Sequence, residues 1–121
     1  MPRVSERKLD PQIEERTLKL LYHLVGELNQ ENSRKVLKAL LTPEERLMLA
    51  KRIGAILMIS AGYNYKQLDQ ILKIVPVTTN KLKKQIKQNQ KIIRDLLSIL
   101  NEQETVKEFY KGVKEKTSQK S

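Results

Sequence analysis

The sequence predicts an all-helical protein. Leu, Lys, Glu and Gln dominate, whereas aromatic residues make up only 4% of the 121 residues. Runs of β-branched or aromatic residues, which would indicate strands, are few. Apolar residues also recur at spacings of three and four in several segments, which is the period of one helix face. A hydrophobic content of 39% suits one packed domain with tails.

The first helix is expected to begin at Asp10 and Pro11, because Asp is a favourable N-cap and Pro suits the first helical position. Residues 1–9 are then a flexible basic arm. The helix continues through apolar residues at helical spacing, namely Leu21, Leu24, Val25 and Leu28. The polar residues 29–32 interrupt this pattern, and a short helix is expected over about residues 33–41.

The third helix has the clearest start signal in the chain. In residues 42–45, Thr at the N-cap, Pro at the first position and Glu at the third form a capping box. The helix should continue to Ala61 and end at Gly62, a favourable residue just after a helix.

This third helix is also apolar on nearly every face. Between Leu47 and Ala61 only Lys51 and Arg52 are charged, and a helix that is hydrophobic all round has to be buried. A short chain supplies little material to enclose such a helix. We therefore predict a homodimer in which a second copy covers it. The alternative is a monomer whose other helices do so.

A helix-turn-helix is predicted over about residues 65–86. Asn64 can cap a helix over about residues 65–72, and Pro76 then prevents a continuous helix. Pro76 suits the first position of the next helix, which is expected to run to about Leu100.

A last helix is predicted after residues 101–104, which resemble another capping box. Its apolar residues follow at spacings of three and four, namely Val106, Phe109, Tyr110 and Val113. Residues after about Gly112 are expected to fray into a disordered basic tail.

The composition argues against catalysis and against metal binding. Cysteine is absent, and the single histidine, His23, lies on a predicted helix without partners for either role. The four glycines are isolated, so no phosphate-binding loop is present. The N-terminus lacks the apolar region of a signal peptide. The longest uncharged run, residues 53–65, falls short of the about 20 residues that span a membrane. We expect a cytoplasmic protein that is not an enzyme and has no membrane partner.

The charge points to a polyanionic partner. The formal net charge is +10, from 24 Lys and Arg against 14 Asp and Glu. Residues 63–94 carry eight basic residues and one acidic residue, a net charge of +7. Nucleic acid or an anionic membrane surface would suit such a segment. The alternative is that the charge only keeps a small protein soluble.

The helix that begins at Pro76 combines a basic face with short polar residues at its N-terminal end. Lysines on and beside this helix are predicted to contact DNA phosphates: Lys66, Lys73, Lys83, Lys84, Lys87 and Lys91. Residues at its N-terminal end are predicted to contact bases: Thr78, Thr79, Asn80 and Lys81. A solvated lysine-rich face without a partner is the alternative.

These motifs together resemble the Trp repressor family. The resemblance rests on residues 41–46 (LTPEER), Leu49, Arg52-Ile53 and Gly62, followed by the helix-turn-helix. It implies a Trp-repressor-like multi-helix fold, an intertwined homodimer, and operator binding in the major groove of double-stranded DNA by about residues 76–84.

The resemblance also implies an effector site that would include Thr42, Arg52 and Lys81. In the tryptophan-responsive repressor the indole lies between two arginines. Arg52 matches the first of these, whereas Lys81 falls at the second and Leu82 at the glycine that follows. Because Lys cannot stack a planar guanidinium on indole, no tryptophan corepressor, and no other cofactor, is predicted.

The predicted organisation is therefore a basic arm over residues 1–9, a Trp-repressor-like DNA-binding domain over 10–100, and a C-terminal helix with a tail over 101–121. The predicted function is sequence-specific transcriptional regulation by a DNA-binding homodimer. The alternatives are an RNA-binding or ribosome-associated protein and a helical protein-interaction module. Tyr63 and Tyr65 are the only aromatic residues near the basic segment, which argues against recognition of single-stranded RNA by stacking.

Overall fold

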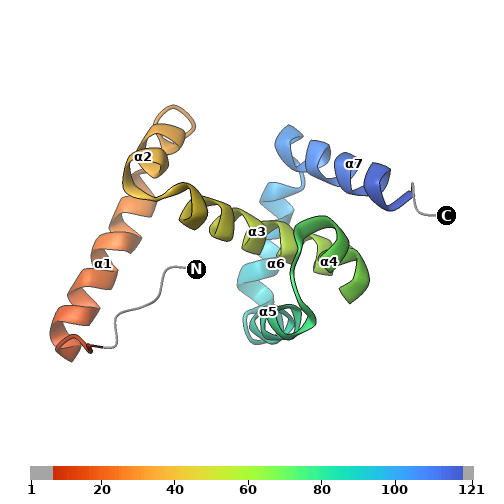
Figure 1. The fold of residues 1–121 in the computed structure, drawn as a ribbon. Coiled ribbons are helices and arrows are strands. Elements are labelled where there is room, and N and C mark those ends of the chain that lie inside the picture. Colours follow the sequence, from red (N-terminus) through yellow and green to blue (C-terminus); the bar gives the residue numbers. More distant parts are fainter. Residues whose placement is uncertain (1–6, 119–121) are drawn as a thin grey trace. The chain divides into compact units, whose positions relative to one another are not determined.

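The computed structural model describes residues 7–118, and this part of the chain is all-helical, without strands (Figure 1). The helices are α1 (Pro11–Glu27), α2 (Ser33–Leu40), α3 (Pro43–Ser60), α4 (Tyr65–Leu72), α5 (Pro76–Gln88), α6 (Gln90–Leu100) and α7 (Glu104–Ser118). The all-α prediction is confirmed. Residues 1–6 of the predicted arm and residues 119–121 of the predicted tail lie outside the described residues.

The chain divides into two compact units inside α3. The N-terminal unit is Met1–Met48 and the C-terminal unit is Leu49–Ser121. This division falls at neither of the boundaries that the sequence suggested, near residues 9 and 100. The candidate DNA-contacting residues all belong to the C-terminal unit.

Local capping explains the helices of the N-terminal unit. Asp10 caps α1, because its carboxylate accepts hydrogen bonds from the backbone N–H groups of Gln12 and Ile13 at 3.1 and 3.3 Å. At the start of α3, Glu45 N–H donates to the Thr42 hydroxyl at 3.1 Å, and Thr42 N–H donates to the Glu45 carboxylate at 2.9 Å. Both predicted helix starts are confirmed.

The N-terminal unit buries little apolar surface. Neither α1 nor α2 contains a fully buried residue. Large apolar side chains are exposed along this unit: Leu9, Ile13, Leu18, Leu20, Leu21, Tyr22, Val25, Leu40 and Leu47. Exposed apolar surface of this extent is typical of an interaction site.

The two halves of α3 differ in burial. Leu49 and Ile53 are about half exposed, at 51% and 52%, whereas Leu57 and Met58 are buried. The expectation that α3 is buried on every face therefore holds only for its C-terminal half within one chain. The helix ends at Ser60, and Gly62 follows with φ of +94°, a conformation that favours glycine.

The C-terminal unit has its own core, to which α7 contributes. The core residues are Ala55, Met58, Leu68, Ile74, Leu82 and Val113. α7 lies against α4, and Gln70 of α4 donates through its side-chain amide to the backbone carbonyl of Lys116 at 3.3 Å (Figure 1). Fraying after about Gly112 was predicted wrongly. The helix continues to Ser118 because Val113, one residue later, is packed in the core.

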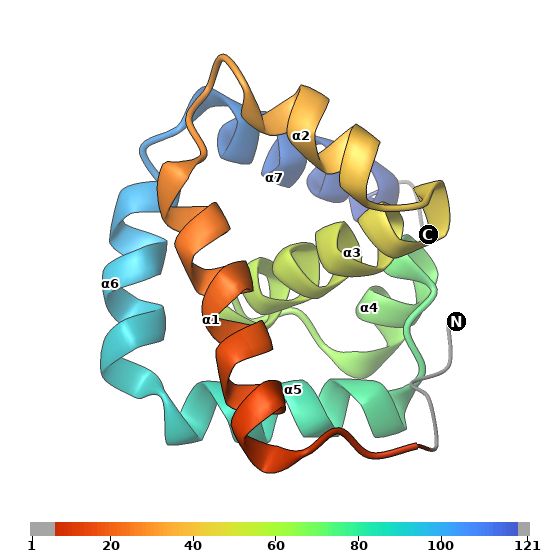
Figure 2. The ribbon, with the colours of Figure 1, turned by 90° about the vertical axis from the view of Figure 1, so that its left-hand side faces the viewer.

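A single helix from Pro76 to Leu100 was also predicted wrongly. The chain turns sharply at Asn89, which has φ −124° and ψ 37° and separates α5 from α6 (Figure 2). The Asn89 side-chain amide donates to the carbonyl of Gln85 at 2.8 Å. An Asn side chain can compete in this way with the helical hydrogen bonds of the backbone.

Candidate nucleic-acid interface

α4 and α5 pack together around a three-residue turn, residues 73–75. Asn64 caps α4, since Gln67 N–H donates to its side chain and Asn64 N–H donates to the Gln67 side chain, both at 2.9 Å. At the turn Lys73 adopts the left-handed conformation, with φ 57° and ψ 45°. Pro76 occupies the first turn of α5, as its fixed φ favours. These local features set the direction in which α5 leaves α4.

One stripe of α5 is buried and the rest of the helix is exposed. The stripe consists of Thr79 and Leu82, at 0% and 2% exposure, with Ile86 partly buried. Their spacing of three and four residues is that of one helix face. Thr78, Asn80 and Lys81 at the N-terminal end of α5 are all exposed. α5 is thus held by its buried stripe and presents its polar residues outward.

The base contact predicted for Thr79 is corrected by this burial. The Thr79 hydroxyl donates to the carbonyl of Val75 at 3.5 Å, and the side chain has no exposed surface. Thr79 is therefore a core residue of the C-terminal unit. Asn80 and Thr78, its neighbours, lie off the buried stripe.

The six lysines predicted to contact phosphates are all exposed, but they do not lie on one helix. Lys66 lies on α4 and Lys73 in the turn, whereas Lys91 lies beyond the break on α6. Because the chain turns at Asn89, Lys91 does not lie on the same helix as Lys84 and Lys87. Among the described residues, the ion pairs join Lys19 to Glu15 and Lys107 to Glu104, so none neutralises these six lysines.

Tyr65 links α4 to the exposed side of α5. Its hydroxyl donates a hydrogen bond to Oδ1 of Asn80, with 2.5 Å between the oxygens. The Nζ atom of Lys83 lies 4.2 Å from the centre of the Tyr65 ring, a cation–π contact. From the sequence, Asn80 and Lys83 were predicted to contact DNA, whereas Tyr65 was weighed only as a residue that could stack on RNA bases. The only local feature of the sequence that indicates where Tyr65 lies is the N-cap at Asn64, which places Tyr65 in the first turn of α4.

Two residues of the predicted effector site, Thr42 and Arg52, are engaged in other interactions. The Thr42 hydroxyl accepts the capping hydrogen bond of α3. The Arg52 guanidinium donates to Oε1 of Gln85 at 3.1 Å, and Gln85 lies one turn after Lys81 on α5. Lys81 itself is exposed.

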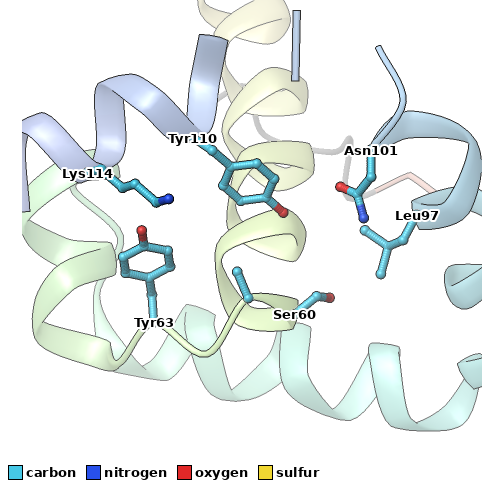
Figure 3. A pocket seen from close by; sticks show the side chains of 7 residues that line it. Ser60, Tyr63, Leu97, Asn101, Tyr110 and Lys114 are labelled. Carbon is cyan, nitrogen blue, oxygen red and sulfur yellow. The ribbon is translucent and has the colours of Figure 1, made fainter. Parts of the chain in front are cut away.

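An open pocket of about 510 Å³ lies where the ends of α3 and α6 meet α7 (Figure 3). Its lining residues are Ser60, Ala61, Tyr63, Leu97, Asn101, Tyr110 and Lys114. The Tyr110 hydroxyl donates to the carbonyl of Leu57 at 3.0 Å. Burial raises the pKa of Tyr110, and the nearby Tyr63 raises it further. None of the candidate DNA-contacting residues lines this pocket.

Residues 7–118 contain neither a membrane-spanning helix nor a metal-binding cluster. No helix within residues 7–118 is long and apolar enough to span a membrane. In the same residues, no three His, Cys, Asp or Glu side chains are grouped so as to hold a metal ion. Comparison of the chain with protein-family models, with curated proteins and with solved structures finds no match.

Proposed function

We propose that the protein is a sequence-specific transcriptional regulator that binds double-stranded DNA as a homodimer. In this proposal α4 and α5 form a helix-turn-helix, and α5 enters the major groove. The N-terminal end of α5 would contact bases through Thr78, Asn80 and Lys81. A Trp-repressor-like arrangement, suggested by the LTPEER segment and the following helices, is part of the proposal.

The observation that carries the proposal is the division of α5 into a buried stripe and an exposed polar surface. Thr79 and Leu82 hold the helix on its unit, while the N-terminal end stays exposed. Lysines that form no ion pair within residues 7–118 lie on α4, on α5 and in the turn between them. Phosphate contacts from such lysines would position the helix on a duplex, and base contacts would supply specificity.

The homodimer is supported by the exposed apolar surface of the N-terminal unit. In a single chain Leu20 and Tyr22 of α1 are 71% and 65% exposed, and no residue of α1 is fully buried. Homodimer interfaces are more apolar than ordinary protein surfaces, so a second copy is a suitable cover. Leu20→Glu should convert the dimer to a monomer in sedimentation experiments, whereas Lys111→Glu on α7 should not. A wild-type monomer would remove this part of the proposal.

No tryptophan corepressor is included in the proposed function. Lys81 stands where the resemblance places the second stacking arginine, and a Lys side chain lacks the planar group that stacks on indole. Calorimetric titration with tryptophan should show no binding at millimolar concentration. Heat of binding that disappears in Arg52→Ala would contradict this expectation.

Selection from a random duplex library tests the proposed function directly. We expect a palindromic consensus, because a symmetric dimer reads two half-sites. Affinity should also fall with salt, with a log–log slope of about −5 for each DNA-binding unit if six lysines contact phosphates. Enrichment without any consensus, or stronger binding to a structured RNA competitor, would contradict the proposal.

Two substitutions separate the roles within α5. Asn80→Ala should change sequence preference by about 1–3 kcal/mol at one base pair. Lys87→Ala should weaken binding to all sequences equally and make the salt slope shallower by about one. Lys114→Ala, which removes an exposed lysine beside the pocket of α7, is the matched control and should change neither quantity.

A further inference from the structure

Tyr65 contacts two side chains on the exposed side of α5. Its hydroxyl donates to Oδ1 of Asn80, and its ring lies 4.2 Å from Nζ of Lys83. Asn80 and Lys83 are three residues apart on one helix, so they are neighbours on its surface. The hydroxyl and the ring of Tyr65 therefore contact different partners, and the hydroxyl contact can be removed while the ring stays.

The hydrogen bond turns the acceptor oxygen of the Asn80 amide toward Tyr65 and leaves both donor hydrogens free. A side-chain amide has one acceptor oxygen with two lone pairs and one nitrogen with two donor hydrogens. Tyr65 occupies one lone pair of Oδ1, while Nδ2 forms no hydrogen bond among residues 7–118. A side chain held in this way meets an approaching group as a donor.

This restriction changes which base edge Asn80 fits. The usual pairing of Asn with adenine is bidentate, since Nδ2 donates to N7 and Oδ1 accepts from the N6 amino group. Guanine instead presents two acceptors, N7 and O6, in the major groove. An Asn80 amide held in this way can donate to guanine with the bond to Tyr65 intact, whereas bidentate pairing with adenine requires Oδ1 to accept a second hydrogen bond or to give up the one from Tyr65.

We propose that Tyr65 is a specificity-determining positioning residue, which holds Asn80 as a hydrogen-bond donor so that it selects guanine over adenine at the base pair it meets. This inference rests on the proposed DNA-binding function. It deepens that function by assigning a base edge to one residue of α5 and a role to one residue of α4.

The decisive variant is Tyr65→Phe, which keeps the ring beside Lys83 and removes only the hydroxyl. The wild-type protein should favour guanine over adenine at one position of each half-site by about tenfold, which is the size of one good base contact. Tyr65→Phe should abolish or reverse this preference, with non-specific affinity unchanged. Tyr63→Phe is the matched control, because it removes the hydroxyl of a tyrosine that lines the α7 pocket, and it should leave the preference intact.

A double variant shows whether Tyr65 acts through Asn80. Asn80→Ala should remove the guanine preference by itself. Adding Tyr65→Phe to Asn80→Ala should cause no further change at that position. A structural effect of Tyr65 alone would instead alter affinity for every sequence and add to the effect of Asn80→Ala.

NMR spectra of the free protein distinguish a failure of the role assigned to Tyr65 from a failure of the proposed DNA-binding function. In NMR spectra Tyr65→Phe should shift the side-chain amide resonances of Asn80, and Tyr63→Phe should not. Unchanged resonances, or a wild-type preference for adenine at the Asn80-dependent position, would overturn the role of Tyr65 while DNA binding stood. A wild-type protein without any sequence preference would refute the proposed function, and the inference with it, even if the resonances shifted.

Discussion

Thr79→Val tests the position of Thr79 in the core. The side chain is fully buried, and its hydroxyl lies 3.5 Å from the carbonyl of Val75. Hydrogen bonds between a hydroxyl and an oxygen are normally 2.5–3.0 Å long. Thr79 therefore buries a polar group with a weak partner. Valine has nearly the same shape and no hydroxyl, so the substitution removes the polar group without opening a large cavity.

The expected gain in stability is about 1 kcal/mol. Burying a hydroxyl without a good partner costs roughly 1–3 kcal/mol, and a normal hydrogen bond would return about 0.5–1.5 kcal/mol. The long bond of Thr79 returns the lower part of that range. Thr and Val have about equal helix propensities, so the backbone contributes little to the difference. For a domain of about 60–100 residues, a gain of this size raises the melting temperature by roughly 4–8 °C.

Thermal unfolding followed by circular dichroism measures this gain, and Thr78→Val is the matched control. Thr78 is exposed, so its substitution should change stability by less than about 0.5 kcal/mol. Selected DNA sequences should stay the same for Thr79→Val and change for Thr78→Val. Destabilisation of Thr79→Val by more than about 1 kcal/mol, or a changed base preference, would refute the reasoning about position 79.

Three further predictions concern the C-terminal unit. Lys73→Gly should be more stable than Lys73→Ala by about 1 kcal/mol in urea unfolding, because alanine in the left-handed conformation at this turn is strained; the reverse order would show that the turn relaxes. Gly54→Leu should destabilise the unit by about 1–3 kcal/mol, since even a Cβ atom at this position lies 3.1 Å from Phe109. Phe109→Leu should partly rescue that variant, and a simple sum of the two losses would argue against the contact. The contribution of Tyr110 to stability should be constant below pH 10 and fall as the pH rises through its raised pKa, because the partly buried phenol resists ionisation in the folded state. Tyr110→Phe should reduce this alkaline loss in pH-dependent melts, whereas the exposed Tyr22→Phe should not.

Several helix starts were predictable because capping is a local interaction. Asp10, the Thr42–Glu45 pair and Asn64 each hydrogen-bond to backbone groups within three residues. Pro76 favours the start of α5 because its ring fixes the backbone φ angle. Such contacts depend on residue types at fixed spacing, and the sequence contains that information directly.

The break at Asn89 shows the limit of local signals. Apolar residues continue at roughly helical spacing on both sides of it, so periodicity favoured one helix. The Asn89 side chain can compete with the backbone hydrogen bonds of a helix, but Asn occurs inside helices as well. Here its side-chain amide donates to the Gln85 carbonyl, and the spacing of apolar residues does not reveal whether an Asn forms that bond.

The sequence by itself determined that this protein is helical, where most of its helices begin, and that positive charge gathers around α4 and α5. These properties follow from residue types and short spacings. Only the tertiary structure decided that Thr79 belongs to the core while Asn80 is exposed, that α7 continues to Ser118, and that Tyr65 holds the Asn80 amide. The physical reason is that burial and side-chain pairing depend on which helices meet, and the partners that decide them are as far as 53 residues apart, as for Tyr110 and Leu57.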